Sequence, residues 1–179
     1  LETSYDYDSN GRLESITDPS GQSLEFSYDG SNHITGVEDS TGRSVAYTYS
    51  GEGDLETVTD AMGGVTTYTY SDHRLTEIED PRHQTILTNH YDGQGRITSQ
   101  EDGLGNEWLI SYAAGETTVT EPEGGERTYA FDSSGHTTEL TDELSRTTSY
   151  DYDGAGMIEA VDAPGGATTA CALSLSRSS

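Results

Sequence analysis

The sequence contains no lysine and only eight arginines, against 33 aspartates and glutamates, so its formal net charge is -25. Nucleic acids and anionic membrane surfaces are bound through a basic face, which this composition does not supply. We therefore expect no nucleic-acid partner and no membrane insertion. Salt screens self-repulsion of this size. A saline, halophilic source is one explanation of the charge, and a plain acidic extracellular surface is the other.

Cysteine is almost absent as well, because Cys171 is the only one. A disulfide within the chain is excluded. The sequence also lacks a Gly-x-Ser-x-Gly elbow and a cysteine with a placed histidine, which are the marks of nucleophilic catalysis. We therefore expect a chain that is not an enzyme, with no catalytic residues and no cofactor.

No spacing typical of a metal site is present either. The five histidines fall in different parts of the chain, where we expect them to be solvated turn residues: His33, His73, His83, His90 and His136. The segment Asp6-x-Asp8-x-Asn10-Gly11 imitates the start of an EF-hand calcium loop, but Thr17 stands where the bidentate Glu is needed. We read that segment as a turn and expect no metal.

Leu, Ile, Val and Phe together make up about 15% of the chain, which with a net charge of -25 ordinarily indicates disorder. The aromatic residues argue against it. All twelve Tyr and both Phe stand at one recurring anchor position or two residues before it. Such placement predicts a folded array with little conventional core, in which rings of successive units stack as a ladder.

The chain consists of eight copies of one sequence repeat, spaced 21 residues apart except for a spacing of 19 before Phe131. The repeat anchors are Tyr7, Tyr28, Tyr49, Tyr70, Tyr91, Tyr112, Phe131 and Tyr152. Each unit also carries a turn acid in a box that usually ends in Gly: Asp18, Asp39, Asp60, Asp80, Asp102, Glu121, Asp142 and Asp162.

Two turns divide each unit. Asp18-Pro-Ser-Gly21 suits a type I turn, and Asp8-Ser-Asn-Gly11 places Gly where φ is positive. Short runs of Thr, Tyr, Val, Leu and Ile lie between the turns, so a unit reads as strand, turn, strand, turn. Leu13 and Ile16 are three apart, which requires a bulge or a two-sided strand.

We predict an all-β fold, an array of eight β-hairpins in a continuous curved or spiral antiparallel sheet. Propeller blades of four strands are the alternative. The absence of any 42-residue alternation favours the continuous array. We expect residues 1–169 to form one domain that enters in mid-repeat, and residues 170–179, which leave the pattern, to be poorly ordered.

The motif Tyr-Asp-x-x-Gly-Arg-Leu followed by Asp-Pro-x-Gly, as in Tyr7 to Gly21, resembles the YD repeat of the Rhs family over residues 3–169. Such repeats occur in bacterial Rhs and wall-associated polymorphic toxins, in the B and C subunits of insecticidal toxin complexes, and in teneurins. The resemblance implies a hollow β-shell that encloses a C-terminal effector. In two units the motif Gly11-Arg12-Leu13 becomes Asn32-His33-Ile34 and Gly53-Asp54-Leu55.

The first functional hypothesis is therefore a non-catalytic structural segment of a Rhs protein that scaffolds or encloses an effector or toxin domain outside this chain. Its partners would be further YD repeats and that effector, and its location secreted or at the cell surface. The alternative is a cell-surface adhesion or carbohydrate-binding module, because rows of Tyr beside carboxylates suit stacking on glycans.

Overall fold

The computed structural model describes residues 2–170, and every regular element in that range is a β-strand. The strands are β1 (Ser4–Tyr7), β2 (Leu13–Thr17), β3 (Ser23–Tyr28), β4 (Ile34–Asp39), β5 (Ser44–Tyr49), β6 (Leu55–Thr59), β7 (Val65–Ser71), β8 (Arg74–Glu79), β9 (Thr85–Tyr91), β10 (Ile97–Asp102), β11 (Glu107–Ala113), β12 (Glu116–Thr120), β13 (Glu126–Phe131), β14 (Thr137–Thr141), β15 (Thr147–Tyr152), β16 (Ile158–Ala163) and β17 (Ala167–Ala170). Among residues 2–170 we find no helix that could span a membrane. The expectation for the tail, Cys171 included, lies outside the described residues.

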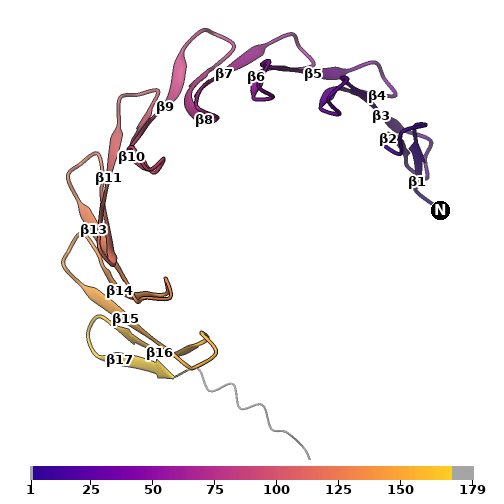
Figure 1. Cartoon of the computed structure of the whole chain (residues 1–179). Coiled ribbons are helices and arrows are strands. Elements are labelled where there is room, and N and C mark those ends of the chain that lie inside the picture. The colour runs from indigo at the N-terminus through magenta and orange to yellow at the C-terminus, as the bar shows by residue number, and fades with distance from the viewer. Residues whose placement is uncertain (1, 171–179) are drawn as a thin grey trace, which may run out of the picture. The chain divides into compact units, whose positions relative to one another are not determined.

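The described residues form two compact units. The first holds the chain up to Asn89 with Asp102–Leu104, and the second holds His90–Glu101 and the residues from Gly105 onward. In the first unit consecutive strands pair antiparallel from β1–β2 through β8–β9 (Figure 1). In the second unit the same holds from β10 to β17. The predicted all-β array of hairpins is confirmed, and neither unit divides into separate four-stranded blades.

A β-bulge explains the spacing of Leu13 and Ile16. Tyr7 pairs with Leu13 and Asp6 with Ser15, so Glu14 is the extra residue. The bulge brings Leu13 opposite Tyr7 and Ile16 opposite Tyr5, on one face of the hairpin. The same register shift stands at the anchors Tyr28, Tyr49, Tyr70, Phe131 and Tyr152. The bulge is therefore part of the repeat, and the two-sided strand is not needed.

Two hairpins depart from this plan. In the regular β5–β6 hairpin, Thr48 pairs with Thr57, nine positions later. In the β7–β8 hairpin the equivalent Thr69 pairs with Glu77, only eight positions later, because a two-residue turn joins the strands. A register shift in the β8–β9 pairing restores the missing residue, which keeps the 21-residue step. The β11–β12 hairpin has a two-residue turn and an unbroken register. The short turn removes one residue and the missing bulge removes another, which together account for the step of 19.

No hydrophobic side chain among the described residues is buried. The buried side chains are polar and belong to Asp80, Asn89 and Ser99. A strand with no conventional core behind it depends on its two neighbours, as in other one-dimensional arrays. The contacts between one hairpin and the next therefore decide stability, and they form the candidate site.

Candidate functional site at the junctions between repeats

Both turns of a hairpin are built on the same carboxylate motif. At one end, Asp18 Oδ1 accepts hydrogen bonds from the backbone N–H groups of Ser20 (2.7 Å) and Gln22 (3.0 Å). At the other end, Asp8 Oδ1 accepts them from Asn10 (2.8 Å) and Arg12 (2.9 Å). An Asp side chain that bonds the backbone two residues later is a recognised turn former. The segment that imitates a calcium loop thus uses its Asp8 and Asn10 to shape a turn.

Most predicted turn acids follow this motif. The backbone N–H two residues later donates to the carboxylate of Asp39, Asp60, Asp80, Asp102 and Asp142 as well. Glu121 closes its turn through its backbone, whose N–H donates to Gly125 O (2.8 Å), while its side chain pairs with Arg127 (3.1 Å).

The last box differs from the others. Asp162 lies inside β16 opposite Thr168, and the turn begins at Ala163, whose carbonyl accepts a hydrogen bond from Gly166 N (3.2 Å). The residue two after Asp162 is Pro164, which has no N–H to donate. The carboxylate motif therefore cannot form there, although the spacing of acid and Gly is kept.

Hydrogen bonds favour the ionised form of several of these carboxylates. The backbone N–H four residues later is the largest cause of the lowered pKa of Asp8 and of Asp92. For Asp142 and Asp80 the side-chain hydrogen bond from the neighbouring arginine lowers the pKa most. The Thr41 hydroxyl is the largest cause at Asp39, whose pKa lies far below its usual range. These carboxylates serve as acceptors for the turns, which is a structural use.

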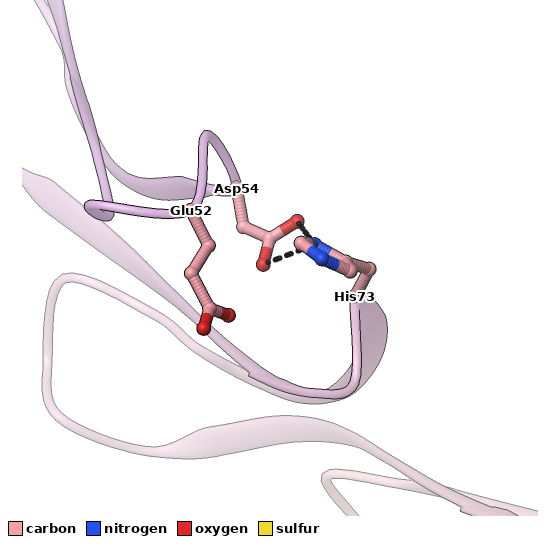
Figure 2. Close-up of side chains that lie close together, drawn as sticks. All are labelled: Glu52, Asp54 and His73. Atoms are coloured by element: carbon pink, nitrogen blue, oxygen red, sulfur yellow. Dashed lines mark hydrogen bonds and ion pairs between the residues drawn. The ribbon is translucent and has the colours of Figure 1, made fainter.

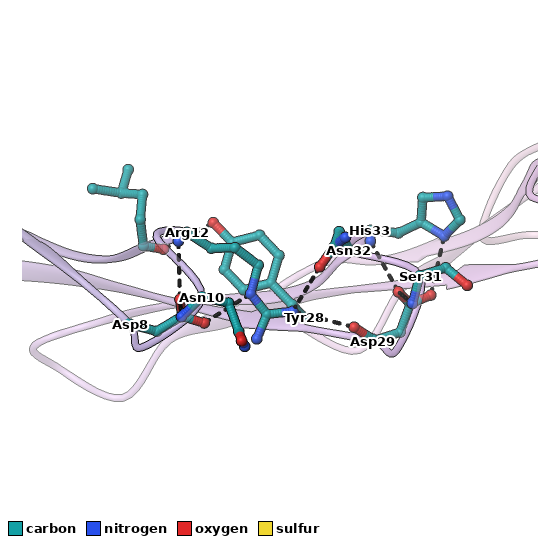
Figure 3. Close-up of polar contacts among 9 residues, drawn as sticks. Asp8, Asn10, Arg12, Tyr28, Asp29, Ser31, Asn32 and His33 are labelled. Atoms are coloured by element: carbon teal, nitrogen blue, oxygen red, sulfur yellow. Dashed lines mark hydrogen bonds and ion pairs between the residues drawn. The ribbon is translucent and has the colours of Figure 1, made fainter.

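A cation or imidazole follows the Asp at the fifth position of the turn and pairs with it. Arg12 lies 2.7 Å from Asp8, and His33 lies 3.0 Å from Asp29. The same side chain then covers the anchor ring of the next repeat. Arg12 Cζ lies 4.6 Å from the centre of the Tyr28 ring (Figure 3). Arg12 also bonds Asn32 Oδ1 (3.2 Å) in the next turn.

The ring contact recurs along the chain. The pairs and their distances are Arg12–Tyr28 (4.6 Å), His33–Tyr49 (4.5 Å), Arg96–Tyr112 (4.2 Å) and His136–Tyr152 (4.7 Å). The two imidazoles lie at 28° and 20° to their rings, which is a stacked arrangement. Arginine over an aromatic face gains a cation–π attraction. We expected the anchor rings to stack on one another, but at these four positions the partner is the turn side chain of the preceding repeat.

The anchor hydroxyl completes each junction. Tyr28 donates to Leu13 O (2.8 Å), Tyr49 to Ile34 O (2.9 Å), Tyr112 to Ile97 O (2.8 Å) and Tyr152 to Thr137 O (2.8 Å). Each acceptor lies 15 residues before its tyrosine, directly after the Arg or His that covers the ring. We call the Asp, the Arg or His, the anchor Tyr and the carbonyl together the repeat clip.

The remaining anchors show what the clip requires. Tyr7 has no described turn before it and is 61% exposed. Phe131 lacks the hydroxyl, and its backbone N–H donates to Gly115 O (2.7 Å). Tyr70 and Tyr91 are partly buried at the ends of β7 and β9. After the shortened β7–β8 turn, Asn89 Nδ2 donates a hydrogen bond to Leu75 O (3.0 Å).

The clip is only partly visible in the sequence. The period reveals Tyr and Asp, but the position filled by Arg12, His33, Arg96 and His136 reads as a variable part of a motif. Arg and His both end in a planar, nitrogen-containing group that can lie on a ring, and this shared chemistry is the signal that could have identified the position. His33 and His136 are therefore partly covered by rings and are not simply solvated turn residues.

The junction before Tyr70 carries an acid where the four junctions with a repeat clip carry an Arg or His. Ser50 replaces the turn Asp, and its Oγ accepts from the backbone N–H groups of Glu52 (3.2 Å) and Asp54 (3.1 Å). The fifth position is Asp54, which pairs with His73 from the β7–β8 turn at 3.0 Å (Figure 2). Burial first and the Asp54 charge second raise the pKa of Tyr70. Asp54 and His73 are 19 residues apart, and the pairing of adjacent hairpins is what joins them.

These junctions define a class of protein: a β-hairpin repeat array in which each unit is fastened to the one before it. The family model described as RHS Repeat matches residues 7–44, 28–61, 49–85 and 131–168. These segments cover more than half of the chain, and the chain belongs to the RHS repeat family.

Solved structures share the fold. The crystal structure of TcdB2-TccC3 is 15% identical with a TM-score of 0.72, and a Tc holotoxin pore of Photorhabdus luminescens is 14% identical with a TM-score of 0.71. Each match covers 94% of this chain, but 11% and 10% of those chains respectively. The chain thus spans about a tenth of the length of the structures it matches. No curated protein matches it.

Proposed function

We propose that this chain is a non-catalytic structural segment of a longer Rhs protein, and that the array scaffolds or encloses an effector domain outside this chain. The observation that carries the proposal is the repeat clip. The charged, aromatic and polar groups of the clip contact one another and thereby hold each hairpin to the next. The chain shares its fold with TcdB2-TccC3, and TccC3 is also named in the structure of the Tc holotoxin pore. This shared fold supports a structural role.

The partners we propose are further YD repeats and a C-terminal effector domain of the parent protein. Tyr5 and Tyr7 present exposed rings on β1, at 56% and 61% exposure. A preceding hairpin with an Arg or His at its fifth turn position would cover Tyr7 as Arg12 covers Tyr28. We place the parent protein outside the cell or at its surface, where a net charge of -25 keeps a large particle soluble.

Electron cryomicroscopy of the full-length parent product tests this proposal. We expect density of the C-terminal domain to lie inside walls built from these repeats, and we expect that domain to resist protease until the wall is opened. A parent protein whose repeats surround no other domain, and whose C-terminal domain is cleaved as fast as the isolated domain, would contradict the proposal.

The second candidate is an adhesion or glycan-binding surface. It is favoured by a cavity of about 430 Å³ that is lined by Tyr47, Tyr49, His33, Asp29 and Glu52. Rings beside carboxylates are suited to stacking on sugars and bonding their hydroxyls. A glycan array probed with this chain separates the two functions. Saturable binding that is lost in Tyr47→Ala would support adhesion, and the structural proposal expects none.

A further inference from the structure

The cluster at the junction before Tyr70 holds three metal-ligand groups. Glu52, Asp54 and His73 each offer one ligand atom, and these atoms lie within 4.8 Å of one another. Within residues 2–170, this is the only trio of His, Cys, Asp and Glu side chains found to converge in this way. One imidazole nitrogen with two carboxylate oxygens is a donor set that suits divalent first-row transition metals.

The backbone on both sides of the cluster is fixed. Ser50 N–H donates to Asp54 O (2.8 Å), and Ser50 Oγ accepts from the two backbone N–H groups that carry the acids. On the other side, Asp72 and His73 have φ values of 50° and 61°, which set a tight two-residue turn. The cluster is therefore presented by two rigid turns of neighbouring hairpins.

Two of the three donors already stand at ligand separation. Ligands that bind one ion at about 2.1 Å are about 3 to 3.5 Å apart. Asp54 and His73 Nδ1 lie 3.0 Å apart, and the Asp54 side chain is 17% exposed. Glu52 is exposed on a flexible side chain, so a rotation about its own bonds suffices to complete the set.

Space for further ligands lies beside the cluster. A cavity of about 440 Å³ is lined by Ser50, Glu52, Asp54, Glu56 and Tyr70, among others. Such a volume holds several waters, each of which needs polar partners of the kind these side chains supply. The cavity, the donor set and the hydrogen-bonded turns thus meet at one place.

We propose that Glu52, Asp54 and His73 form a site for a divalent first-row transition metal such as Zn²⁺, with water completing the coordination. The ion binds Nδ1 of the neutral imidazole, whose single N–H proton then lies on Nε2, and a protonated imidazole releases its Nδ1 proton to solvent on binding. It then connects the β5–β6 turn to the β7–β8 turn. At this junction Asp54 replaces the Arg or His of the clip, and the metal supplies the missing positive charge.

Calorimetric titration with Zn²⁺ tests the site, using the whole chain after EDTA treatment and dialysis. We expect saturable binding of one ion per chain. His73→Ala and Glu52→Gln should each weaken it by about tenfold or more, because changing even an outer-shell partner of a metal costs that much affinity. Glu52→Gln is an exposed, isosteric change that leaves the fold in place.

His83→Ala is the matched control. His83 also lies in a tight turn, with φ of 60°, and its Nδ1 lies 2.8 Å from Glu79. It belongs to no group of three donors within residues 2–170, so Zn²⁺ affinity should be unchanged in this variant. A rise in the midpoint of thermal unfolding with Zn²⁺ should likewise be kept in His83→Ala and lost in His73→Ala.

Three outcomes would overturn the proposal. The first is no saturable Zn²⁺ binding up to about 1 mM, the limit of weak specific association. The second is binding that His73→Ala and Glu52→Gln leave unchanged, which would mean diffuse attraction to the acidic surface. The third is Ca²⁺ binding of equal strength, since Ca²⁺ takes oxygen ligands and gains nothing from an imidazole.

Discussion

The Tyr49 hydroxyl donates a hydrogen bond to the carbonyl oxygen of Ile34, 2.9 Å away and 15 residues earlier in the chain. His33, the residue just before that carbonyl, lies on the face of the same ring with 4.5 Å between centroids. One side chain thus fastens a repeat to its predecessor at two points. The stability of the array should therefore depend on both contacts, and each can be removed separately.

Tyr49→Phe removes the hydroxyl and keeps the ring. The Ile34 carbonyl loses its partner, so we expect unfolding free energy to fall by about 1 kcal/mol, the net value of one hydrogen bond. Urea denaturation in high salt measures it. Tyr7→Phe is the control, because that side chain is 61% exposed, and it should change stability by less than about 0.5 kcal/mol. Equal losses in both variants would contradict the role of the hydroxyl.

Tyr49→Ala removes the ring as well. Truncation of a large aromatic side chain costs about 3 kcal/mol or more where the ring is packed. We expect that loss at Tyr49 and a much smaller one for Tyr7→Ala. Because each repeat depends on its neighbours, Tyr49→Ala should also broaden the urea transition. Small and equal losses for the two variants would show that the rings are solvated and do not stabilise the array.

Arg96→Lys tests the planar group of the clip. Lysine keeps the charge beside Asp92 but loses the flat guanidinium, which lies 4.2 Å from the centre of the Tyr112 ring. We expect a loss of about 0.5 to 1 kcal/mol in urea unfolding. Arg82→Lys is the control, since Arg82 pairs with Asp80 in a turn of the other kind and its side chain is 76% exposed. A loss in Arg82→Lys as large as in Arg96→Lys would assign the effect to the ion pair alone.

Acid should unfold the array through the turn carboxylates. The pKa values of Asp8, Asp39, Asp92 and Asp142 are lowered in the folded chain, so the unfolded chain binds more protons near pH 4. Their contribution is present above the unfolded pKa of about 3.9 and is lost as pH falls through the folded values. We expect stability to rise as mild acid reduces the net charge, and then to fall below about pH 4.

Asp39→Asn provides the control for this pH dependence. The amide oxygen can still accept the Thr41 and Arg43 N–H groups, but it does not titrate. Urea midpoints measured from about pH 2 to 7 should fall less steeply in acid for this variant. An acid limb as steep as that of the parent chain would show that Asp39 does not contribute to it.

The sequence predicts the hairpins, their number and their turns, because each of these features depends on residues close together in the chain. Asp18 with Gly21 defines a turn by the chemistry of a few residues, and Tyr28 marks the end of a strand by its period. The bulge after Leu13 shows in the sequence only as an irregular spacing. Whether that spacing means a bulge depends on which residue of the partner strand lies opposite Tyr7. The sequence of one strand alone does not determine the pairing register.

Contacts between hairpins were harder to foresee. The partner of Tyr49 is His33, 16 residues away, and nothing within either repeat indicates that the turn side chain covers the ring. The constant step from Tyr70 to Tyr91 hid a shortened turn and a compensating bulge. Asp54 and His73 meet only because adjacent hairpins place their turns side by side, a contact that the sequence period does not specify.

A double-mutant cycle on Arg96 and Tyr112 tests most directly whether neighbouring repeats are held by the clip. Urea unfolding of Arg96→Ala, Tyr112→Leu and the double variant gives their coupling energy, with Arg82→Ala and Tyr112→Leu as the reference pair. We predict coupling of about 0.5 to 1 kcal/mol or more for the first pair and none for the reference pair. Losses that simply add for Arg96 and Tyr112 would contradict the clip.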